Sequence, residues 1–174
     1  TAVREYLELF HDPEQEKTRR PHTAFIPDPC KLLRALVILN GAFAAAVQHR
    51  SPQKSATLDM DATLVETLKK AALYCYKKFK AYQPLNVYWA EQGLMLFSEF
   101  RDGNVPAGYD LLRPFKEALD LVPEGVGKVY LRSDTAGYVA DLLRYCAEGK
   151  NKRFGVIEFA VGADVTEAFR QAVV

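Results

Sequence analysis

Apolar positions along the chain change their spacing near residue 55. Before it, they recur every three or four residues, which predicts a helix with one buried stripe. The stripe consists of Leu32, Leu33, Leu36, Leu39, Asn40, Phe43 and Val47. Asp28 is the expected N-cap of this helix, with Pro29 at its first position. From Ser55 onward, SATLDMDATLV alternates apolar and polar residues, which is typical of a β-strand.

The rest of the chain alternates between strand-like and helix-like segments. LNVYWAEQGLMLFSEFRDGN predicts a hairpin that turns at Glu91-Gln92-Gly93. A helix in YDLLRPFKEALDLV, with Pro114 in its first turn, comes next. KVYLRSD then predicts a strand, GYVADLLRYCAEG a helix, RFGVIEFAVG a strand and TEAFRQAVV a helix. This order indicates an α/β fold with a mixed sheet flanked by helices. It is also the element order of the ribonuclease H-like fold.

The first part of the chain is predicted to be a helical N-terminal extension. VREYLELF, residues 3–10, has the spacing of a short amphipathic helix, and the polar segment HDPEQEKTRRPHTAFIPDP is interpreted as a connector. We therefore expect residues 1–54 to form the extension and residues 55–174 the core domain. Because the sequence starts at Thr1 and stops at FRQAVV, we expect a piece of a longer protein.

Composition indicates a soluble globular domain. Of the 174 residues, 49% are hydrophobic and 26% charged, which argues against disorder. The net charge of +1 means that any nucleic-acid surface must be a local patch. The longest apolar run, LLRALVILNGAFAAAV, is interrupted by Arg34 and Asn40 and falls short of the ~18 residues of a membrane helix. We expect no membrane contact and a cytoplasmic location.

The cysteines do not indicate a zinc site or disulfides. The three cysteines are far apart and form no CxxC pair, and the histidines are not spaced with them as ligand pairs. These residues are Cys30, Cys75 and Cys146, and His11, His22 and His49. Three reduced thiols are therefore expected.

Asp59 and Asp61 lie two positions apart in the strand that begins at Ser55. Residues at this spacing point to the same face of a strand, where two like charges repel each other. Two interpretations are open: both acids face solvent, or this face binds a divalent cation.

Asp134 stands where a strand ends and a helix is about to start. It could cap that helix, or it could be a ligand, since α/β sheets bind ligands at the carboxyl ends of their strands. In a ribonuclease H-like order, its strand lies beside the strand of Asp61, so the two acids would converge. Converging carboxylates suit Mg²⁺ or Mn²⁺, and two such ions can support phosphodiester chemistry.

A lysine-rich stretch follows the first strand. It contains no acid between Glu66 and Glu91, and tyrosines are interleaved with its lysines. These lysines are Lys69, Lys70, Lys77, Lys78 and Lys80, and the tyrosines are Tyr74, Tyr76 and Tyr82. Such a patch could bind a phosphate backbone. The alternative is a solvated helix or loop that packs Leu68, Ala72, Cys75 and Phe79 inward. Arg132 could meet phosphate or orient the acid, or form a surface ion pair.

Three segments together carry a family resemblance. TLDMDATLVET, YQPLNVYWAEQGLMLFSEFRDGNVPAG and VYLRSDTAGYVADLL, with FIPDP and FGVIEFAVGADVTEAF at the two ends, resemble the catalytic domain of DDE-type insertion-sequence transposases. The resemblance implies a ribonuclease H-like fold and an active site with two Mg²⁺ or Mn²⁺ ions. It implies that Asp61, in the DAT motif, and Asp134, in the Arg-x-Asp motif, are the first two catalytic acids and metal ligands. Asp59 is not a catalytic acid by this comparison.

The third acid of the family is a Glu on a helix after the strand in RFGVIEFAVG. The nearest acids, Glu158, Asp164 and Glu167, have the wrong context, because the first lies within a strand and the others precede or open a helix. We therefore expect the third acid beyond residue 174 and little or no catalysis by this fragment itself.

The resemblance implies an activity and a set of partners. Metal-dependent cleavage at the ends of a transposon frees a 3′-hydroxyl, which then attacks target DNA. The expected partners are transposon ends, target DNA and a second copy of the protein in a homodimer, in the bacterial cytoplasm at the nucleoid. Two alternatives remain: an inactive remnant that binds DNA or a partner, and a ribonuclease H-like nuclease that cuts without joining.

Overall fold

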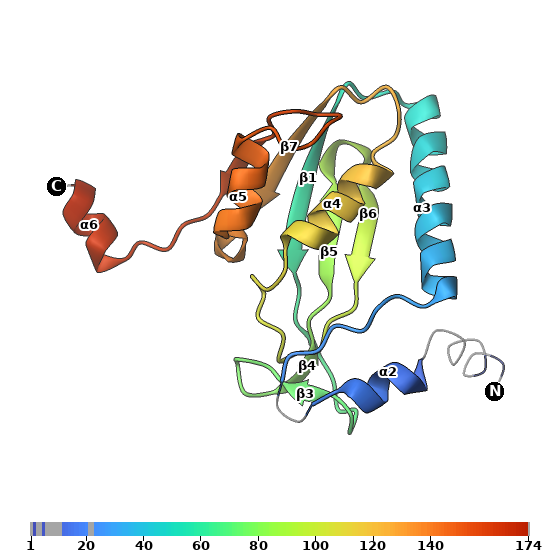
Figure 1. Cartoon of the computed structure of the whole chain (residues 1–174), viewed down its shortest axis with the longest axis vertical. Coiled ribbons are helices and arrows are strands. Elements are labelled where there is room, and N and C mark those ends of the chain that lie inside the picture. Colours follow the sequence, from blue (N-terminus) through green and yellow to red (C-terminus); the bar gives the residue numbers. More distant parts are fainter. Residues whose placement is uncertain (1, 3–4, 6–11, 21–22, 174) are drawn as a thin grey trace.

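A five-stranded mixed sheet forms the centre of the molecule in the computed structural model (Figure 1), which describes residues 2, 5, 12–20 and 23–173. The strand order is β6-β5-β1-β7-β8. β1 is parallel to β7 and antiparallel to β5, β7 is parallel to β8, and β5 is antiparallel to β6. The strands are β1 (Ser55–Ala62), β5 (Leu85–Trp89), β6 (Leu94–Glu99), β7 (Lys128–Ser133) and β8 (Glu158–Val161).

Alternation along β1 decides which face of the sheet is buried. Ala56, Leu58 and Met60 are buried, whereas the residues between them are exposed or half-buried. In β7, Val129 and Leu131 are buried in the same way. The apolar face therefore packs into the core, and the odd-numbered residues of β1 lie on the opposite face.

Two helices cover the apolar face. α4 (Leu112–Leu121) and α5 (Ala140–Ala147) lie over the same side of the sheet in Figure 1. α4 buries Phe115 and Leu119 in the core, and Pro114 is its third residue, which confirms its place in the first turn. A proline there costs no hydrogen bond, because the first amides of a helix have no intrahelical partner.

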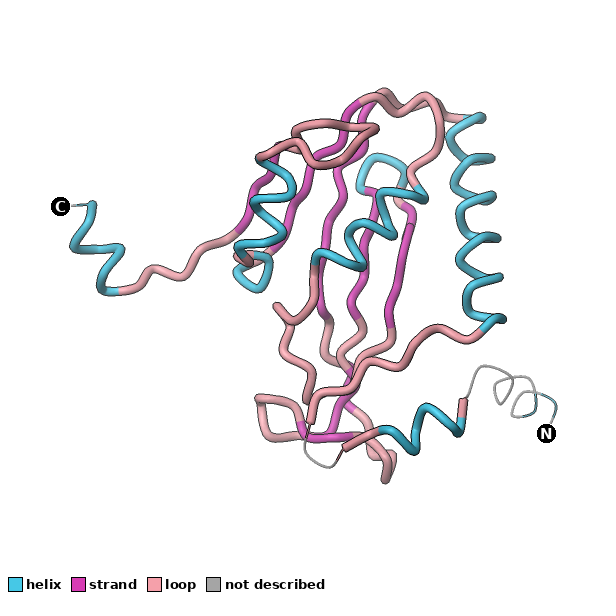
Figure 2. Tube along the Cα trace, viewed as in Figure 1, coloured by secondary structure: helices cyan, strands magenta, loops and turns pink. Residues whose placement is uncertain are grey.

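The predicted hairpin is confirmed, and so are the predicted strands and core helices. β5 and β6 are joined by the short 3₁₀ helix η1 (Ala90–Gln92), and Gly93 follows it with a φ of 63°, a conformation that favours glycine. After β8, the chain runs away from the sheet as a loop and then forms α6 (Glu167–Val173), as Figure 2 shows.

A second, three-stranded sheet lies between β1 and β5 in the sequence. Its order is β2-β4-β3, with β2 (Val65–Glu66), β3 (Leu73–Tyr74) and β4 (Lys80–Tyr82). The sequence does not predict it, because strands of two or three residues are too short to show a period. Of the side chains expected to pack inward here, Ala72 and Cys75 are buried, but Leu68 is 97% exposed.

The N-terminal part begins with α2 (Pro13–Thr18), within the segment interpreted as a connector. Asp12 caps α2 by accepting hydrogen bonds from two of its first amides. The predicted helix in VREYLELF falls on residues 3–10, which apart from Glu5 lie outside the described residues.

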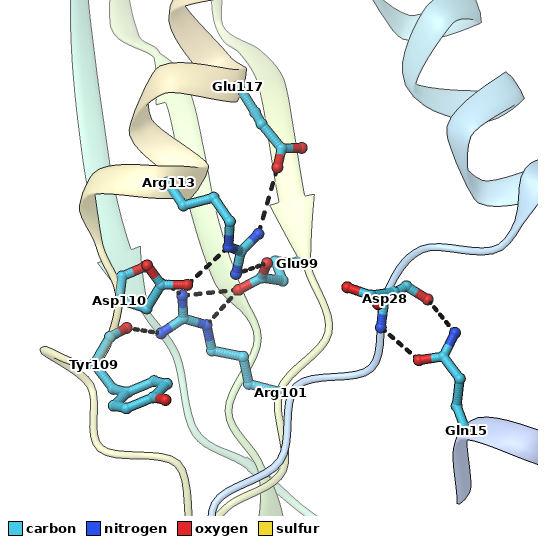
Figure 3. Close-up of polar contacts among 8 residues, drawn as sticks. All are labelled: Gln15, Asp28, Glu99, Arg101, Tyr109, Asp110, Arg113 and Glu117. Atoms are coloured by element: carbon cyan, nitrogen blue, oxygen red, sulfur yellow. Dashed lines mark hydrogen bonds and ion pairs between the residues drawn. The ribbon is translucent and has the colours of Figure 1, made fainter. Parts of the chain in front are cut away.

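The predicted start of the long helix is wrong by two residues. α3 runs from Lys31 to Arg50, and its N-cap position is occupied by Cys30. Asp28 is therefore not the cap. Its backbone forms two hydrogen bonds with the side chain of Gln15 instead: its N donates to Oε1 at 2.6 Å, and its O accepts from Nε2 at 2.9 Å (Figure 3). Pro29 precedes the helix, and its carbonyl accepts a hydrogen bond from Arg34 Nε at 3.1 Å.

The predicted buried stripe of α3 is also wrong. α3 stands beside β6 in Figure 1, and only Ala44 and Gln48 are buried along its length. Leu39 is 65% exposed and Phe43 is 55% exposed. Small and amide side chains make the contact with the sheet instead: Asn40 Nδ2 donates to the carbonyls of Met95 and Leu96 on β6, at 2.9 and 2.6 Å. These bonds satisfy carbonyls on an edge strand.

By length and composition, α3 is the one helix among the described residues that would suffice to cross a membrane. The sequence predicts no such helix, because Arg34 and Asn40 interrupt the apolar run. Core helices of soluble proteins meet the same requirements of length and composition. The bonds from Asn40 to β6 attach α3 to the domain.

Candidate metal centre and adjoining basic surface

Asp61 lies at the carboxyl end of the central strand. It is the second-to-last residue of β1, it pairs with Asn86 of β5, and it is exposed. Its Oδ2 accepts a hydrogen bond from Thr63 Oγ1 at 2.9 Å. No hydrogen bond or ion pair to its Oδ1 occurs within the described part of the chain, so this oxygen can face a ligand.

Asp134 directly follows β7 and is also exposed. Its Oδ1 accepts a hydrogen bond from Ala136 N at 2.9 Å, which caps the 3₁₀ helix η2 (Thr135–Gly137). The capping interpretation therefore describes a real contact. It does not compete with the ligand interpretation, because a cap uses one oxygen and leaves Oδ2 for a cation.

The register of β1 and β7 places these two acids side by side. Met60 pairs with Ser133 in the parallel ladder, Asp61 is the next residue of β1, and Asp134 is the first residue after β7. Neighbouring strands lie about 4.8 Å apart. Asp59 and Arg132 lie on the sheet face opposite the core. Asp61 comes two residues after Asp59, and Asp134 comes two residues after Arg132, so both acids are expected on that same face.

Two adjacent carboxylates, each with one uncommitted oxygen, fit a hard divalent cation. Mg²⁺ and Mn²⁺ prefer oxygen ligands and keep positions for water and phosphate. No group of three or more His, Cys, Asp or Glu side chains that could hold a metal occurs among the residues that the structure describes. The candidate site therefore contains two carboxylates within the described residues.

Asp59 is bound to Arg132 rather than facing solvent alone. Arg132 donates from Nε and from an Nη to the two carboxylate oxygens of Asp59, at 2.5 and 2.6 Å. These hydrogen bonds raise the pKa of the Arg132 guanidinium. The positive charge also offsets the repulsion expected between Asp59 and Asp61. Of the three roles weighed for Arg132, the ion pair is the contact that the structure contains.

The structure does not bring the nearest candidates for a third acid to this edge. Glu158 is the first residue of β8 and pairs in register with Tyr130, three residues before Ser133. Its carboxylate bonds Lys128 Nζ at 2.6 Å. Asp164 and Glu167 belong to the segment that leaves the sheet after β8.

The small sheet carries the lysine-rich stretch and lies beyond the end of β1 that bears Asp61 (Figure 1). Four of the predicted lysines are exposed: Lys69, Lys70, Lys77 and Lys78. Lys80 is half-buried, and its Nζ bonds the carbonyl of Lys70 at 2.9 Å. These lysines, called the basic surface below, belong to the part of the chain that forms the small sheet.

Two tyrosines stand out from the same surface. Tyr74 is 65% exposed and Tyr76 is 73% exposed. Lysine ammonium groups lie over both rings: Lys80 Nζ is 6.0 Å from the centroid of Tyr74, and Lys77 Nζ is 5.7 Å from that of Tyr76. Such aromatic faces amid positive charge are typical of nucleic-acid surfaces.

A buried charge cluster near this edge was not found from the sequence (Figure 3). Arg101 is 0% exposed, and it bonds Glu99 at 2.8 Å and the carbonyl of Tyr109 at 2.6 Å. Burial lowers the pKa of Arg101, and the charge of Glu99 opposes that shift. Arg113 of α4 also bonds Glu99, at 2.6 Å. The cluster ties the end of β6 to the start of α4. An Arg in a polar loop gives no signal of burial.

Comparison with known proteins identifies the class. The five-stranded order, with two acids at the carboxyl ends of adjacent parallel strands, is that of a ribonuclease H-like domain. The family model for the transposase DDE domain group 1 matches residues 24–174, and the chain belongs to this family. This confirms the family resemblance and the fold. Neither the curated proteins nor the solved structures gave a match.

Family membership supports a transposase-type function with DNA as the partner. Transposases of this class generally use divalent metal ions, which agrees with the donor set at Asp61 and Asp134.

Proposed function

We propose that this domain is the catalytic part of a protein that, at its full length, carries out metal-dependent phosphodiester cleavage and strand transfer at transposon ends, with Asp61 and Asp134 as ligands of Mg²⁺ or Mn²⁺. The observation that carries the proposal is the register of β1 and β7, which puts the two acids on adjacent positions at one edge of the sheet. Both are exposed, so DNA can reach them.

The chain's own residues prepare this site. Thr63 Oγ1 and Ala136 N each engage one oxygen of an acid, which restrains both carboxylates and leaves the second oxygen of each for a cation. When bound, the divalent ions supply positive charge that activates the attacking hydroxyl and stabilises the leaving oxygen. In the first displacement, water attacks the phosphorus and the bond to the 3′-oxygen breaks, which frees a 3′-hydroxyl. In the second, that hydroxyl attacks a phosphorus of target DNA and displaces the 3′-oxygen of the target strand.

The basic surface on the small sheet supplies the DNA contact in this proposal. Exposed lysines neutralise phosphates and place the duplex without reading its sequence. Its position beyond the end of β1 would set a phosphodiester near Asp61. Arg132 donates to Asp59 from Nε and from one Nη, and the remaining N–H groups of its exposed guanidinium are available for a phosphate.

The further proposals rest on family membership alone. They are that a third acidic ligand completes the site, that two Mg²⁺ or Mn²⁺ ions bind, and that a homodimer holds paired transposon ends at the nucleoid. Sedimentation of the protein with and without DNA that carries the element's ends tests the homodimer. A complex with one protomer per pair of ends would contradict it.

Asp61→Asn and Asp134→Asn test the ligand assignment. In the full-length protein, each should abolish cleavage of DNA that carries the element's ends, while DNA binding in a gel-shift assay remains. Asp120→Asn, an exposed acid at the end of α4, is the matched control and should retain cleavage. Cleavage retained by either Asp61→Asn or Asp134→Asn would refute the assignment.

A DNA-binding domain that does not cut is the second candidate. It is favoured by the lack of a three-ligand metal group among the described residues. Assays of the full-length protein with Mn²⁺ separate the candidates: a binding protein gives no cleaved product, a nuclease gives cleaved ends only, and a transposase also gives joined products.

A further inference from the structure

Two side-chain links join β1 to β7 immediately before the two acids. Ser133 Oγ donates a hydrogen bond to the carbonyl oxygen of Met60 at 2.8 Å. Met60 directly precedes Asp61, and Ser133 directly precedes Asp134. Asp59 and Arg132 form the preceding pair of the ladder, and Arg132 donates hydrogen bonds to both carboxylate oxygens of Asp59 at 2.5 and 2.6 Å.

The links lie on opposite faces of the sheet. Ser133 follows the buried residues Val129 and Leu131 at a spacing of two, so its side chain is on the core side. The Asp59–Arg132 pair is on the other face, where the side chains of Asp59 and Arg132 are 29% and 59% exposed. Together the links fix the two strands from both sides.

The turn after Asp134 is fitted closely around Ser133. A Cβ atom placed on Gly137 would lie 2.5 Å from both Cβ and Oγ of Ser133, so only glycine fits there without displacing the serine. On the other side, a Cβ atom on Gly162 would lie 3.2 Å from the backbone carbon of Asp134 and 3.0 Å from Thr135 N. Gly162 N also bonds the carbonyl of Ser133 at 3.2 Å. The position of Ser133 is thus set by contacts on several sides.

We infer that Ser133 and the Asp59–Arg132 pair are positioning residues, which set the separation of the Asp61 and Asp134 carboxylates and so favour small divalent ions over Ca²⁺. The inference rests on the proposed function. Its physical basis is that the two kinds of ion differ in the coordination geometry they require. Mg²⁺ requires near-octahedral geometry with oxygens at about 2.0–2.1 Å, whereas Ca²⁺ accepts irregular coordination shells at about 2.3–2.6 Å. Freeing the strand ends should therefore weaken Mg²⁺ and Mn²⁺ binding more than Ca²⁺ binding.

Arg132→Gln separates positioning from simple electrostatics. Removing a positive charge beside a cation site, and releasing the charge of Asp59, would tighten Mn²⁺ binding if charge alone mattered. The positioning role predicts the opposite sign, because the strand ends lose a link. The exchange Asp59→Arg with Arg132→Asp keeps the net charge and can re-form the pair, so it should restore most of the affinity.

The experiment is a titration of the 174-residue chain with Mn²⁺, followed by paramagnetic broadening of the amide signals of Thr63 and Ala136, with competition by Ca²⁺. We expect Ser133→Ala and Arg132→Gln each to weaken Mn²⁺ binding by about tenfold, the usual scale for residues that orient metal ligands. Ca²⁺ binding should change by less than about threefold on the same grounds. Lys128→Gln breaks the ion pair with Glu158, which links β7 to β8 rather than to β1, and is the control.

The outcomes distinguish the two hypotheses. If Asp61→Asn and Asp134→Asn leave Mn²⁺ broadening unchanged, the proposed function fails. If those variants lose binding but Ser133→Ala and Arg132→Gln bind Mn²⁺ as tightly as the parent chain, the positioning inference alone is overturned. Thermal unfolding of each variant checks folding, and Arg132→Gln, an exposed change, keeps the test decisive if Ser133→Ala unfolds.

Discussion

The two sheets of this domain are built in contrasting ways. The five-stranded sheet has a continuous apolar face under α4 and α5, and it places Asp61 and Asp134 on adjacent strands. The three-stranded sheet has strands of two or three residues and carries exposed lysines and tyrosines. A metal site requires side chains held to a fraction of an ångström, so it belongs on the packed sheet. Phosphate contacts tolerate flexible side chains, so they can lie on the small one.

The largest expected effect comes from the core of the five-stranded sheet. Phe115 is 0% exposed and packs in the core under α4. Phe115→Ala should lower the free energy of unfolding by about 3–5 kcal/mol, because it removes buried apolar area and leaves a cavity. Urea denaturation followed by circular dichroism measures it. Tyr76→Ala on the small sheet is the comparison and should change stability by less than about 0.5 kcal/mol. Similar losses of stability in the two variants would contradict the contrast between the two sheets.

Arg101 connects the two sheets, so its replacement tests how far they depend on each other. Its carbonyl accepts a hydrogen bond from Gln83 N, just after β4, at 2.8 Å, while its side chain bonds Glu99 at the end of β6. Arg101→Met should destabilise the domain by about 3 kcal/mol, because it leaves a largely buried carboxylate short of a partner.

Hydrogen exchange locates the effect of Arg101→Met. Amides of β4 should exchange faster in this variant, because losing the side-chain bond to Glu99 frees the segment whose backbone carbonyl bonds Gln83 N. A double variant, Arg101→Met with Glu99→Leu, should recover part of the stability. Unchanged exchange in β4 would show that the small sheet does not depend on the cluster.

Alkaline pH should destabilise the core through Cys146. Burial raises the pKa of the Cys146 thiol to about 11. The folded state therefore keeps a proton that the unfolded state releases, so this contribution to stability is intact below the ordinary value of 9.0 and is lost as pH rises from there to about 11. Chemical denaturation at pH 8, 9 and 10 measures the slope. Cys146→Ala should reduce the slope of stability against pH. An identical slope in this variant would contradict the assignment of the pH dependence to the Cys146 thiol.

The smallest effect concerns the basic surface. Replacing Lys69, Lys70, Lys77 and Lys78 by Gln should weaken DNA binding by about tenfold or more at moderate salt and flatten its salt dependence, because fewer counterions are released. Folding stability should stay within about 0.5 kcal/mol of the parent chain. Fluorescence anisotropy at several salt concentrations measures both affinity and slope. Lys150→Gln with Lys152→Gln is the control, and an equal loss there would mean that the surface is not specific.

Prediction from sequence succeeded where a segment was long enough to show a period. Alternation identified β1 and the β5–β6 hairpin, and Pro114 located the first turn of α4. It failed for the small sheet, whose strands are too short. It also failed for α3, because periodicity shows that a helix has an apolar side but not whether anything covers that side. Asn40 and Ala44 contact the domain, while Leu39 and Phe43 are exposed.

The sequence likewise predicted only some features of the candidate site. Asp61 and Asp134 were proposed from their motifs and from the element order, and the register of β1 and β7 sets them side by side. The pairing of Asp59 with Arg132, the bond from Ser133 to Met60 and the buried Arg101 had no signal in the sequence. Each depends on partners remote along the chain.

The sequence by itself determined the α/β class and the family, because these follow from local periodicity and from short motifs. Tertiary structure decided which face of α3 is covered, how the lysines are presented, and which side chains link β1 to β7 beside the two candidate acids. The physical reason is that such contacts form between strands and helices distant in sequence, where packing and register, rather than local preference, select the partners.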